Sequence, residues 1–331
     1  MASTSSKPAR PDLLRASLLF IVVFVFVVGL LIGCARLATE ALMSDAAQDV
    51  DYYLSKVGER LSKRRSKTAD DERPPGLLYN ASGRPAWINN HDANATFFRL
   101  LNQRHWKARV LRMPTRFKRS GAWGSWVVLL ENFTTADEAS HVIDAVGSDW
   151  RRAKLDGAVA SLAYNSRRSD VAFCNVRDRR RCGSKPELFD AVGKIMRRVE
   201  SAIGISSEHF EATQLLRYKE GDHLIEHHDT PPGFGRTYGV RMLTAFLYLS
   251  DLPEGAGGET AFPLLPASGR HGVDGQLAVA PRVGRLLVWP NVRDDHPARG
   301  LSDMRMVHMA KEVKRGVKHA ANIWVHLFRA P

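Results

Sequence analysis

The stretch QLLRYKEGDHLIEHHD, residues 214–229, ends in a histidine and an aspartate two positions apart, His227 and Asp229. The run before them predicts a strand, and side chains two apart on a strand point to the same face. The imidazole and the carboxylate are therefore expected to converge on one point. Two histidines and one carboxylate hold Fe(II) in non-haem sites and leave open positions on the metal. His308, in the C-terminal part of the chain, is our candidate for the second histidine.

Four further motifs follow this pair in order. They are RMLTAFLYL at residues 241–249, GGETAFP at 257–263, GRLLVWP at 284–290 and GVKHAANIW at 316–324. His308 lies between the last two, and Lys318 follows it by ten residues. This succession resembles the catalytic domain of the prolyl 4-hydroxylases, the Fe(II)- and 2-oxoglutarate-dependent dioxygenases of collagen type and of plant or algal type. The resemblance extends over about residues 126–328.

The resemblance implies that the two histidines and the aspartate bind Fe(II), with 2-oxoglutarate and O2 as cosubstrates and L-ascorbate as a reductant. One carboxylate of 2-oxoglutarate chelates the metal, and the other needs a buried cation, for which Lys318 is the candidate. Small residues alternate with Lys318 along its predicted strand and leave space for a ligand. The family pattern also assigns Tyr218, nine residues before His227, and Thr244 to the cosubstrate pocket.

The resemblance further implies a proline-rich or collagen-like polypeptide as the substrate, hydroxylated to 4-hydroxyproline. The residues expected to contact this peptide are Arg167, Ser169, Arg241, Trp324 and His326. The first two form an Arg-x-Ser motif, which in the family lies over the substrate cleft. The other three fall where the family contacts the peptide. Trp324 has an alternative role as a residue that fills the barrel.

Three positions depart from the family pattern. Leu224 and Thr230 stand where the family has aromatic residues, and Glu312 replaces a proline. These departures motivate a second hypothesis, in which the same chemistry acts on lysine or another side chain. A third hypothesis is a non-catalytic peptide-binding module that retains the fold, although the complete set of metal and cosubstrate residues argues against it.

From residue 213 onward, short apolar segments separated by Gly and Pro loops dominate. The predicted strands are TQLLRY, MLTAFLYLS, ETAFPLL, QLAVAP, RLLVWP, MVHMA and HAANIWVHLF. This spacing predicts a two-layer jelly roll, which fits the double-stranded β-helix of the oxygenase family. Helices are predicted at residues 135–146 and 188–203. The expected fold is thus mainly β with flanking helices, in a catalytic domain at residues 125–331.

Residues 16–35, ASLLFIVVFVFVVGLLIGCA, are almost wholly apolar and long enough to cross a bilayer as a single transmembrane helix. Lys7, Arg10 and Arg15 precede this run, so the positive-inside rule places residues 1–15 in the cytosol and the rest of the chain in the lumen. We therefore predict a single-pass type II protein of the endoplasmic reticulum or Golgi membrane. A cleaved signal peptide is the alternative, but its apolar core would be unusually long.

Residues 36–75 are predicted to form a helical stem followed by a charged linker that ends in two prolines. Residues 76–124 form an N-terminal extension that matches no element of the oxygenase pattern. Within it, residues 94–106 fit a helix and residues 107–117 fit a strand.

Three cysteines occur, and Cys34 lies in the apolar run. Cys174 and Cys182 enclose a short polar loop, and their spacing fits either one local disulfide or two free thiols. Three Asn-x-Ser/Thr sequons are candidate glycosylation sites: Asn80, Asn94 and Asn132. The first two are expected to be the better acceptors, because the third adjoins a predicted strand.

The formal charge of +13 over 331 residues is spread along the chain without a nucleic-acid-binding motif, so we predict no nucleic acid partner. A basic surface suits acidic substrates or anionic lipids. The apolar content of 44% and charged content of 25% are ordinary for a globular protein, so the chain as a whole is not expected to be disordered. The oligomeric state does not follow from the sequence.

Overall fold

The computed structural model describes residues 85–114, 125–153, 167–178, 182, 185–230, 239–269, 271–293, 297 and 300–329. The chain divides into two units, Met1–Thr68 and Ala69–Pro331, and all of these residues belong to the second. The predicted tail, membrane anchor, stem and linker at residues 1–75 lie outside the described residues, as does Asn80. Among the residues that are described, no helix combines the length and apolar character needed to cross a membrane.

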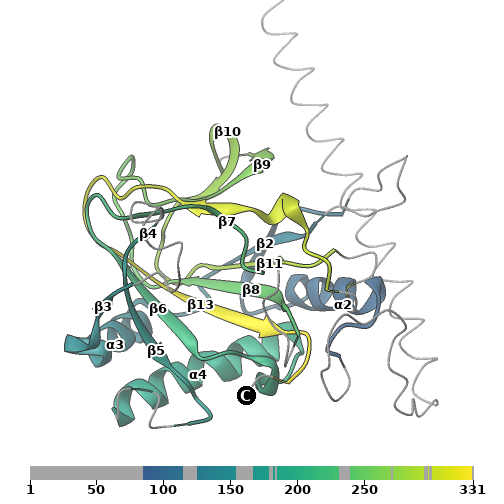
Figure 1. Cartoon of the computed structure of the whole chain (residues 1–331), viewed down its shortest axis with the longest axis horizontal. Helices are drawn as coiled ribbons and strands as arrows, with labels where there is room; N and C mark the ends of the chain where they lie inside the picture. Colours follow the sequence, from purple (N-terminus) through teal and green to yellow (C-terminus); the bar gives the residue numbers. More distant parts are fainter. Residues whose placement is uncertain are drawn as a thin grey trace, which may run out of the picture. The chain divides into compact units, whose positions relative to one another are not determined.

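Two antiparallel sheets face each other and form the body of the second unit (Figure 1). In spatial order, the larger sheet contains β1 (Lys107–Arg112), β2 (Val127–Glu131), β11 (Leu286–Pro290), β8 (Arg241–Tyr248), β13 (Lys318–His326), β6 (Thr213–Tyr218), β5 (Asp170–Cys174) and β3 (Arg151–Arg152). The smaller sheet contains β10 (His271–Val279), β9 (Thr260–Ser268), β12 (His308–Ala310), β7 (His223–His227) and β4 (Arg167–Arg168). This mainly β arrangement is that of a jelly roll, so the predicted core fold is confirmed.

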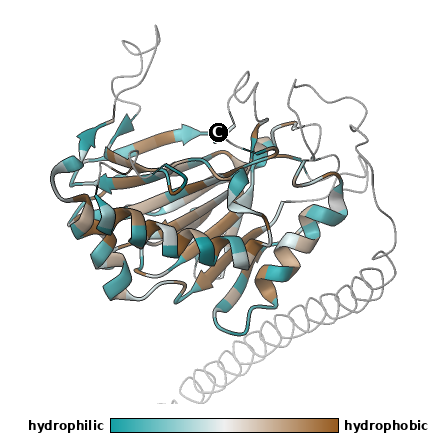
Figure 2. Ribbon diagram, turned by 90° about the horizontal axis from the view of Figure 1, so that it is seen from below, coloured by the Kyte–Doolittle hydropathy of each residue, from teal (hydrophilic) through white to brown (hydrophobic). Residues whose placement is uncertain are grey.

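Both predicted helices are present, and they lie below the larger sheet in Figure 1: α3 (Ala136–Val146) and α4 (Pro186–Ile203). Thr135 and Glu138 form a capping box that begins α3. Gly204 ends α4 with a φ of +72°, a backbone conformation that favours glycine. Figure 2 shows polar residues on the outward faces of the helices, while apolar side chains of α3 and α4 are buried. The described residues also contain α2 (Asn90–Leu101), η1 (Gly147–Asp149), η3 (Ser207–His209) and η5 (Met304–Met306).

The predicted N-terminal extension contributes to the same layers. Strand β1 pairs along β2 and forms the edge of the larger sheet. Helix α2 packs near α4, and its Phe97 stacks on Trp126 with ring centroids 5.5 Å apart. The helix and the strand expected within residues 94–117 are thus present, and both support the sheet that carries the site.

Large apolar side chains from both sheets fill the space between them. Trp289 of β11 contacts Phe262 of β9 at a centroid distance of 5.3 Å, and Phe246 contacts Tyr248 at 5.0 Å. All four are buried. Burial of one such side chain stabilises a fold by about 1.5–3 kcal/mol. The interior between the sheets is therefore a packed core, and polar groups within it require partners.

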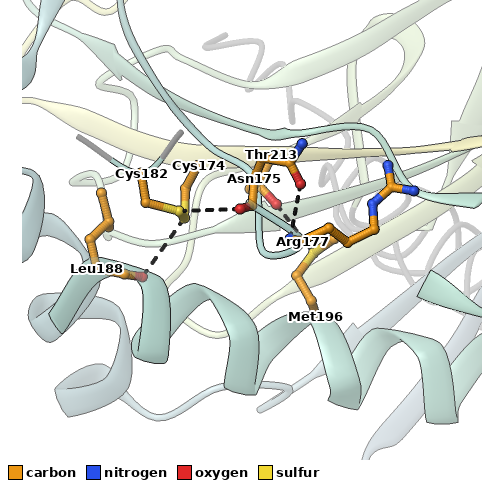
Figure 3. Close-up of a disulfide and its surroundings, with 7 residues drawn as sticks. All are labelled: Cys174, Asn175, Arg177, Cys182, Leu188, Met196 and Thr213. Atoms are coloured by element: carbon orange, nitrogen blue, oxygen red, sulfur yellow. Dashed lines mark hydrogen bonds between the residues drawn. A yellow bond between two sulfur atoms is a disulfide. The ribbon is translucent and has the colours of Figure 1, made fainter. Parts of the chain in front are cut away.

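Cys174, at the end of β5, and Cys182 are joined by a disulfide, and both are fully buried. Of the two arrangements that the spacing allows, the structure has the bonded one. The sulfurs lie against the carbonyl oxygens of Asn175 and Leu188, at 3.6 and 4.0 Å (Figure 3). Because Leu188 belongs to the first turn of α4, the disulfide packs the end of β5 against the beginning of that helix.

Candidate active site

Three potential metal ligands meet inside the jelly roll. Nε2 of His227 lies 3.6 Å from Oδ1 of Asp229, and Nε2 of His308 lies 3.6 Å from Oδ2 of the same carboxylate. One ligand atom from each residue lies within 4.8 Å of the others. Ligand atoms around a first-row metal ion, with bonds of about 2.1 Å, are roughly 3–4 Å apart. The three side chains are therefore spaced to share one ion.

A β-bulge aims His227 into the interior. His227 pairs with His308, whereas Leu224 pairs with Ala310, so three steps along β7 match two along β12. This irregularity lets both Leu224 and His227 face inward although they are three residues apart. Strand β7 ends at His227. The expectation that one strand carries both His227 and Asp229 is therefore wrong, and Asp229 turns inward beyond the end of the strand.

Backbone carbonyl groups determine which nitrogen of each imidazole carries the proton. Nδ1 of His227 lies 2.9 Å from the carbonyl oxygen of Ile225, and Nδ1 of His308 lies 2.9 Å from that of Met306. A carbonyl only accepts hydrogen bonds, so each Nδ1 carries the proton and each Nε2 keeps a free lone pair. Surrounding protein atoms disfavour the charged form of His227 and, with nearby His308, lower its pKa to about 4. His227 is therefore neutral at physiological pH, as a metal ligand must be.

Asp229 provides the anionic ligand. Its side chain is buried, which by itself would raise its pKa. The adjacent imidazoles of His308 and His227, together with a 2.7 Å hydrogen bond from Thr244, outweigh burial and lower the pKa to about 2. Two imidazole nitrogens and one carboxylate oxygen gathered at one point match the donor set of non-haem Fe(II). The residues present thus fit the implied metal.

Lys318 is fully buried in the same interior. Its Nζ donates a 2.7 Å hydrogen bond to the carbonyl oxygen of Gly258 and lies 5.2–5.6 Å from the ring centroids of Tyr218, Phe246 and Tyr248. Burial lowers its pKa to about 7, although the charge of Glu259 opposes the change. No described carboxylate is within ion-pair distance of Nζ. A buried ammonium without a counter-ion is costly, so the site favours a ligand that brings a carboxylate.

The predicted cosubstrate residues lie at different places in this interior. Tyr218 pairs with Lys318 across β6 and β13, and burial raises its pKa to about 12. It is therefore protonated and able to donate a hydrogen bond. Thr244 instead contacts the metal carboxylate, because its hydroxyl bonds Asp229. Tyr248 donates to Thr260 at 2.8 Å beside the lysine, which adds Thr260 to the walls around Lys318.

The predicted peptide contacts form two groups. Arg241 stacks on Trp324, with its guanidinium carbon 3.6 Å from the ring centroid, and pairs with Glu211 through two bonds of 2.7 and 3.1 Å. The same guanidinium donates to the backbone carbonyl of Asp229 at 3.3 Å. His326 is buried, with Nε2 3.5 Å from Glu211. These three predicted residues therefore make one cluster beside the metal ligands, with Glu211 at its centre.

Arg167 and Ser169 form the second group. Arg167 lies on β4, next to β7, and its Nε donates a 3.2 Å hydrogen bond to Ser169. The positive charge of Arg167 contributes to lowering the pKa of His227 and opposes the rise in that of Tyr218. The charge of Arg167 therefore acts both on a metal ligand and on a predicted cosubstrate residue.

The described sequons differ in their surroundings. Asn94 lies in α2, where its amide oxygen accepts a 2.8 Å hydrogen bond from the indole of Trp126. Asn132 is exposed, in a turn with a φ of +59°. In the folded chain Asn132 is thus the more accessible of the two, and glycosylation of either remains a prediction.

Three residues of the site carried no prediction: Glu211, Thr260 and Asn291. Thr260 lies inside the motif GGETAFP, and Asn291 directly follows GRLLVWP. Their positions in the sequence mark them as neighbours of buried strands. Which side chain turns inward, however, depends on strand pairing, and no local pattern reveals it.

Comparison with known proteins agrees with this geometry. Residues 213–326 match the model of the 2OG-Fe(II) oxygenase superfamily. Probable prolyl 4-hydroxylase 9 of Arabidopsis thaliana is 28% identical, over 62% of this chain and 69% of its own. Probable prolyl 4-hydroxylase 3 of the same plant is 30% identical, over 40% of this chain and half of its own length.

A solved structure of the viral collagen prolyl hydroxylase of Paramecium Bursaria Chlorella virus-1, in complex with 2OG, is also similar. It has 22% identity and a TM-score of 0.42, and the match covers 60% of this chain and 95% of that one. The matched superfamily segment contains all three metal ligands and Lys318. Together, the superfamily match, the sequence relatives and the His-Asp-His site support a 2-oxoglutarate- and Fe(II)-dependent dioxygenase that is similar to the prolyl 4-hydroxylases.

Proposed function

We propose that this dioxygenase converts prolyl residues of secretory-pathway proteins to 4-hydroxyproline while anchored in the membrane by its N-terminal apolar run. The proposal rests on the place where His227, Asp229 and His308 meet. The same interior holds the buried Lys318, which has no described carboxylate within ion-pair distance. The similarity to probable prolyl 4-hydroxylases of Arabidopsis thaliana supports proline as the acceptor. When bound, Fe(II) with 2-oxoglutarate supplies the chemistry that inserts one atom of O2 into a C–H bond, and L-ascorbate is the proposed reductant.

The residues of the chain have distinct tasks in this proposal. His227, Asp229 and His308 hold the metal. Lys318, with Tyr218 beside it, binds the far carboxylate of 2-oxoglutarate and so orients the keto acid. The buried aromatic core excludes water from the reacting centre, which suppresses side reactions.

The peptide is proposed to lie against the cluster formed by Arg241, Trp324, His326 and Glu211. Within this cluster, Arg241 also contacts the backbone of Asp229. A peptide bound to the cluster would therefore have its target residue close to the metal. Arg167, on β4 beside β7, contributes a second positive charge. Trp324 is buried under the guanidinium of Arg241, so its proposed role is to support Arg241, which would meet the proline-rich or collagen-like segment.

The test uses the full chain in detergent with Fe(II), labelled 2-oxoglutarate, ascorbate and proline-rich peptides. Peptide-stimulated decarboxylation, abolished by His227→Ala, is the expected result. Mass spectrometry of the peptide then locates the added oxygen. Oxygen on lysine or another side chain would favour the second hypothesis, whereas stoichiometric peptide binding by an iron-free protein without turnover would favour a non-catalytic module.

The proposed location is the lumen of the endoplasmic reticulum or Golgi, with a type II anchor at residues 16–35. Two observations support it: the length of the apolar run, and the buried disulfide, a bond that persists in oxidising compartments. Protease treatment of sealed microsomes should leave the catalytic part intact until detergent is added. Digestion without detergent would place this part in the cytosol instead.

A further inference from the structure

A chain of three buried side chains leads from β11 to the metal carboxylate. Nδ2 of Asn291 lies 2.8 Å from Oγ1 of Thr244, and this oxygen lies 2.7 Å from Oδ2 of Asp229. Thr244 and Asn291 are completely inaccessible to solvent, and Asp229 is 3% exposed. Asn291 is fixed in turn by its backbone, which donates to Met242 at 2.7 Å and accepts from Asp303 at 2.9 Å.

The chemistry of the three groups fixes the direction of both hydrogen bonds. The Asp229 carboxylate is ionised and can only accept, so the single hydroxyl proton of Thr244 points at Oδ2. Oγ1 is then left to accept, and its other neighbour must donate. The amide of Asn291 therefore presents its NH2 group to Thr244, and its oxygen faces the other way.

This arrangement leaves Asn291 with an unfavourable feature. Its Oδ1 is buried and has no hydrogen-bond partner among the described residues. A buried acceptor without a partner destabilises the folded state. Stability alone therefore does not account for an asparagine here, whereas a need for an amide donor behind Thr244 does.

We propose that Thr244, oriented by Asn291, is a positioning residue that fixes the rotation of the Asp229 carboxylate. The Thr244 hydrogen bond takes one lone pair of Oδ2, which lies 3.6 Å from Nε2 of His308, so Oδ1, 3.6 Å from Nε2 of His227, is the oxygen that keeps both lone pairs for the metal. An aspartate held in this way would offer one oxygen to Fe(II) and would leave other positions on the metal open for the keto acid and O2. Without the hydrogen bond, the carboxylate is free to rotate and to chelate through both oxygens.

The test compares metal binding by variants of the full chain, without turnover. Thr244→Val removes the hydroxyl, and its Co(II) affinity should fall roughly 10- to 100-fold, as is typical when a partner of a metal ligand is lost. Thr244→Ser keeps the hydroxyl and should restore binding to near the unmodified value. The absorption spectrum of bound Co(II) reports coordination directly, and it should change in Thr244→Val and revert in Thr244→Ser.

Asn291→Ala supplies a second and independent variant. It should weaken Co(II) binding in the same direction, and the double variant Thr244→Val/Asn291→Ala should be no weaker than Thr244→Val alone, because both act through one chain. Thr213→Val is the matched control: Thr213 is a buried threonine on β6 whose hydroxyl bonds Met196, away from the metal ligands. Its Co(II) affinity and spectrum should match those of the unmodified protein.

The inference rests on the proposed metal site, and the outcomes separate the two. If the unmodified protein binds no Co(II), the metal site itself is wrong. If the unmodified protein binds Co(II) and Thr244→Val gives the same affinity and spectrum, or if Thr213→Val lowers affinity equally, the positioning role is overturned.

Discussion

Lys318 and Tyr218 occupy paired positions on β13 and β6, and Nζ of the lysine lies 5.2 Å from the centre of the tyrosine ring. Both side chains are buried, and the strand pairing holds them at one end of the interior while His227 and His308 meet on the opposite sheet. A cation on one wall and a metal site on the other suit a ligand with an anionic group at each end. 2-Oxoglutarate has this form.

Lys318→Met should weaken 2-oxoglutarate binding by roughly 10- to 100-fold, because a hydrogen bond to a charged group contributes about 1.5–3 kcal/mol. Metal affinity should not change. Calorimetric titration of 2-oxoglutarate into the Mn(II)-loaded protein measures the effect. Lys311→Met is the control, since Lys311 pairs with Asp274 at the surface, and it should bind like the unmodified protein. If Lys318→Met bound 2-oxoglutarate as tightly as the unmodified protein, Lys318 would not be part of the cosubstrate site.

The affinity for 2-oxoglutarate should fall as the pH rises above 7. Burial lowers the pKa of Lys318 to about 7, so the free protein loses this positive charge in the range from pH 7 to 9. Apparent affinity should drop by up to about tenfold per pH unit there, and Lys318→Met should show no such dependence. Titrations at pH 6, 7, 8 and 9 measure both profiles, and a flat profile in the unmodified protein would contradict the prediction.

The lowered pKa of Lys318 also makes the stability of the metal-free protein depend on pH. The lysine has an ordinary pKa of 10.5 in the unfolded chain and about 7 in the folded one. Between these values the unfolded state binds more protons, so the free energy of unfolding should rise with pH. Lys318→Met should flatten this slope and unfold at a higher urea concentration at pH 7. Urea titrations monitored by tryptophan fluorescence test it, and an unchanged slope in the variant would exclude Lys318 as the cause.

Glu211→Gln should raise the KM for the peptide several-fold while leaving the 2-oxoglutarate affinity unchanged. Glu211 holds Arg241 by two hydrogen bonds and lies beside His326, so its loss frees both side chains of the peptide cluster. Glu208→Gln is the matched control, because Glu208 is a half-exposed residue that pairs with Arg329. Steady-state kinetics with varied peptide and with varied cosubstrate separate the two constants. A change in the KM for 2-oxoglutarate alone would place Glu211 in the cosubstrate site instead.

Replacement of both bonded cysteines, Cys174→Ala/Cys182→Ala, should reduce stability by about 2–3 kcal/mol, the amount expected for a disulfide that closes a loop of this length. The bond packs β5 against α4 and not against the metal ligands. Metal affinity should therefore be retained in the folded variant. Thermal unfolding and Co(II) titration measure the two quantities, and a loss of metal binding below the melting temperature would show that the disulfide also shapes the site.

The sequence predicted most of the sheet, because buried strands between Gly and Pro loops have a clear pattern. TQLLRY corresponds to β6 residue for residue, and the capped helix at residues 135–146 is α3. Strand β1 was expected as a strand but not as the edge of the larger sheet, because its pairing with β2 depends on contacts between separate segments of the chain.

The ligand set was predictable from residue types, but its geometry was not. His227 and Asp229 were expected to converge as alternate residues of one strand. They converge instead because a bulge re-aims His227 and a hydrogen bond from Thr244 holds Asp229. Bulges and inward-facing polar residues depend on the pairing of distant strands, which no local stretch of sequence encodes. Asn291 shows this most clearly, because only the register of β11 against β8 brings it to Thr244.

The most direct measurement is mass spectrometry of a proline-rich peptide after incubation with the full chain, Fe(II), 2-oxoglutarate and ¹⁸O-labelled O2. We expect one ¹⁸O atom on each hydroxylated proline, and none when His308→Ala replaces the unmodified protein. An iron-loaded, folded protein that leaves the peptide unlabelled, or that places the label only on residues other than proline, would contradict it.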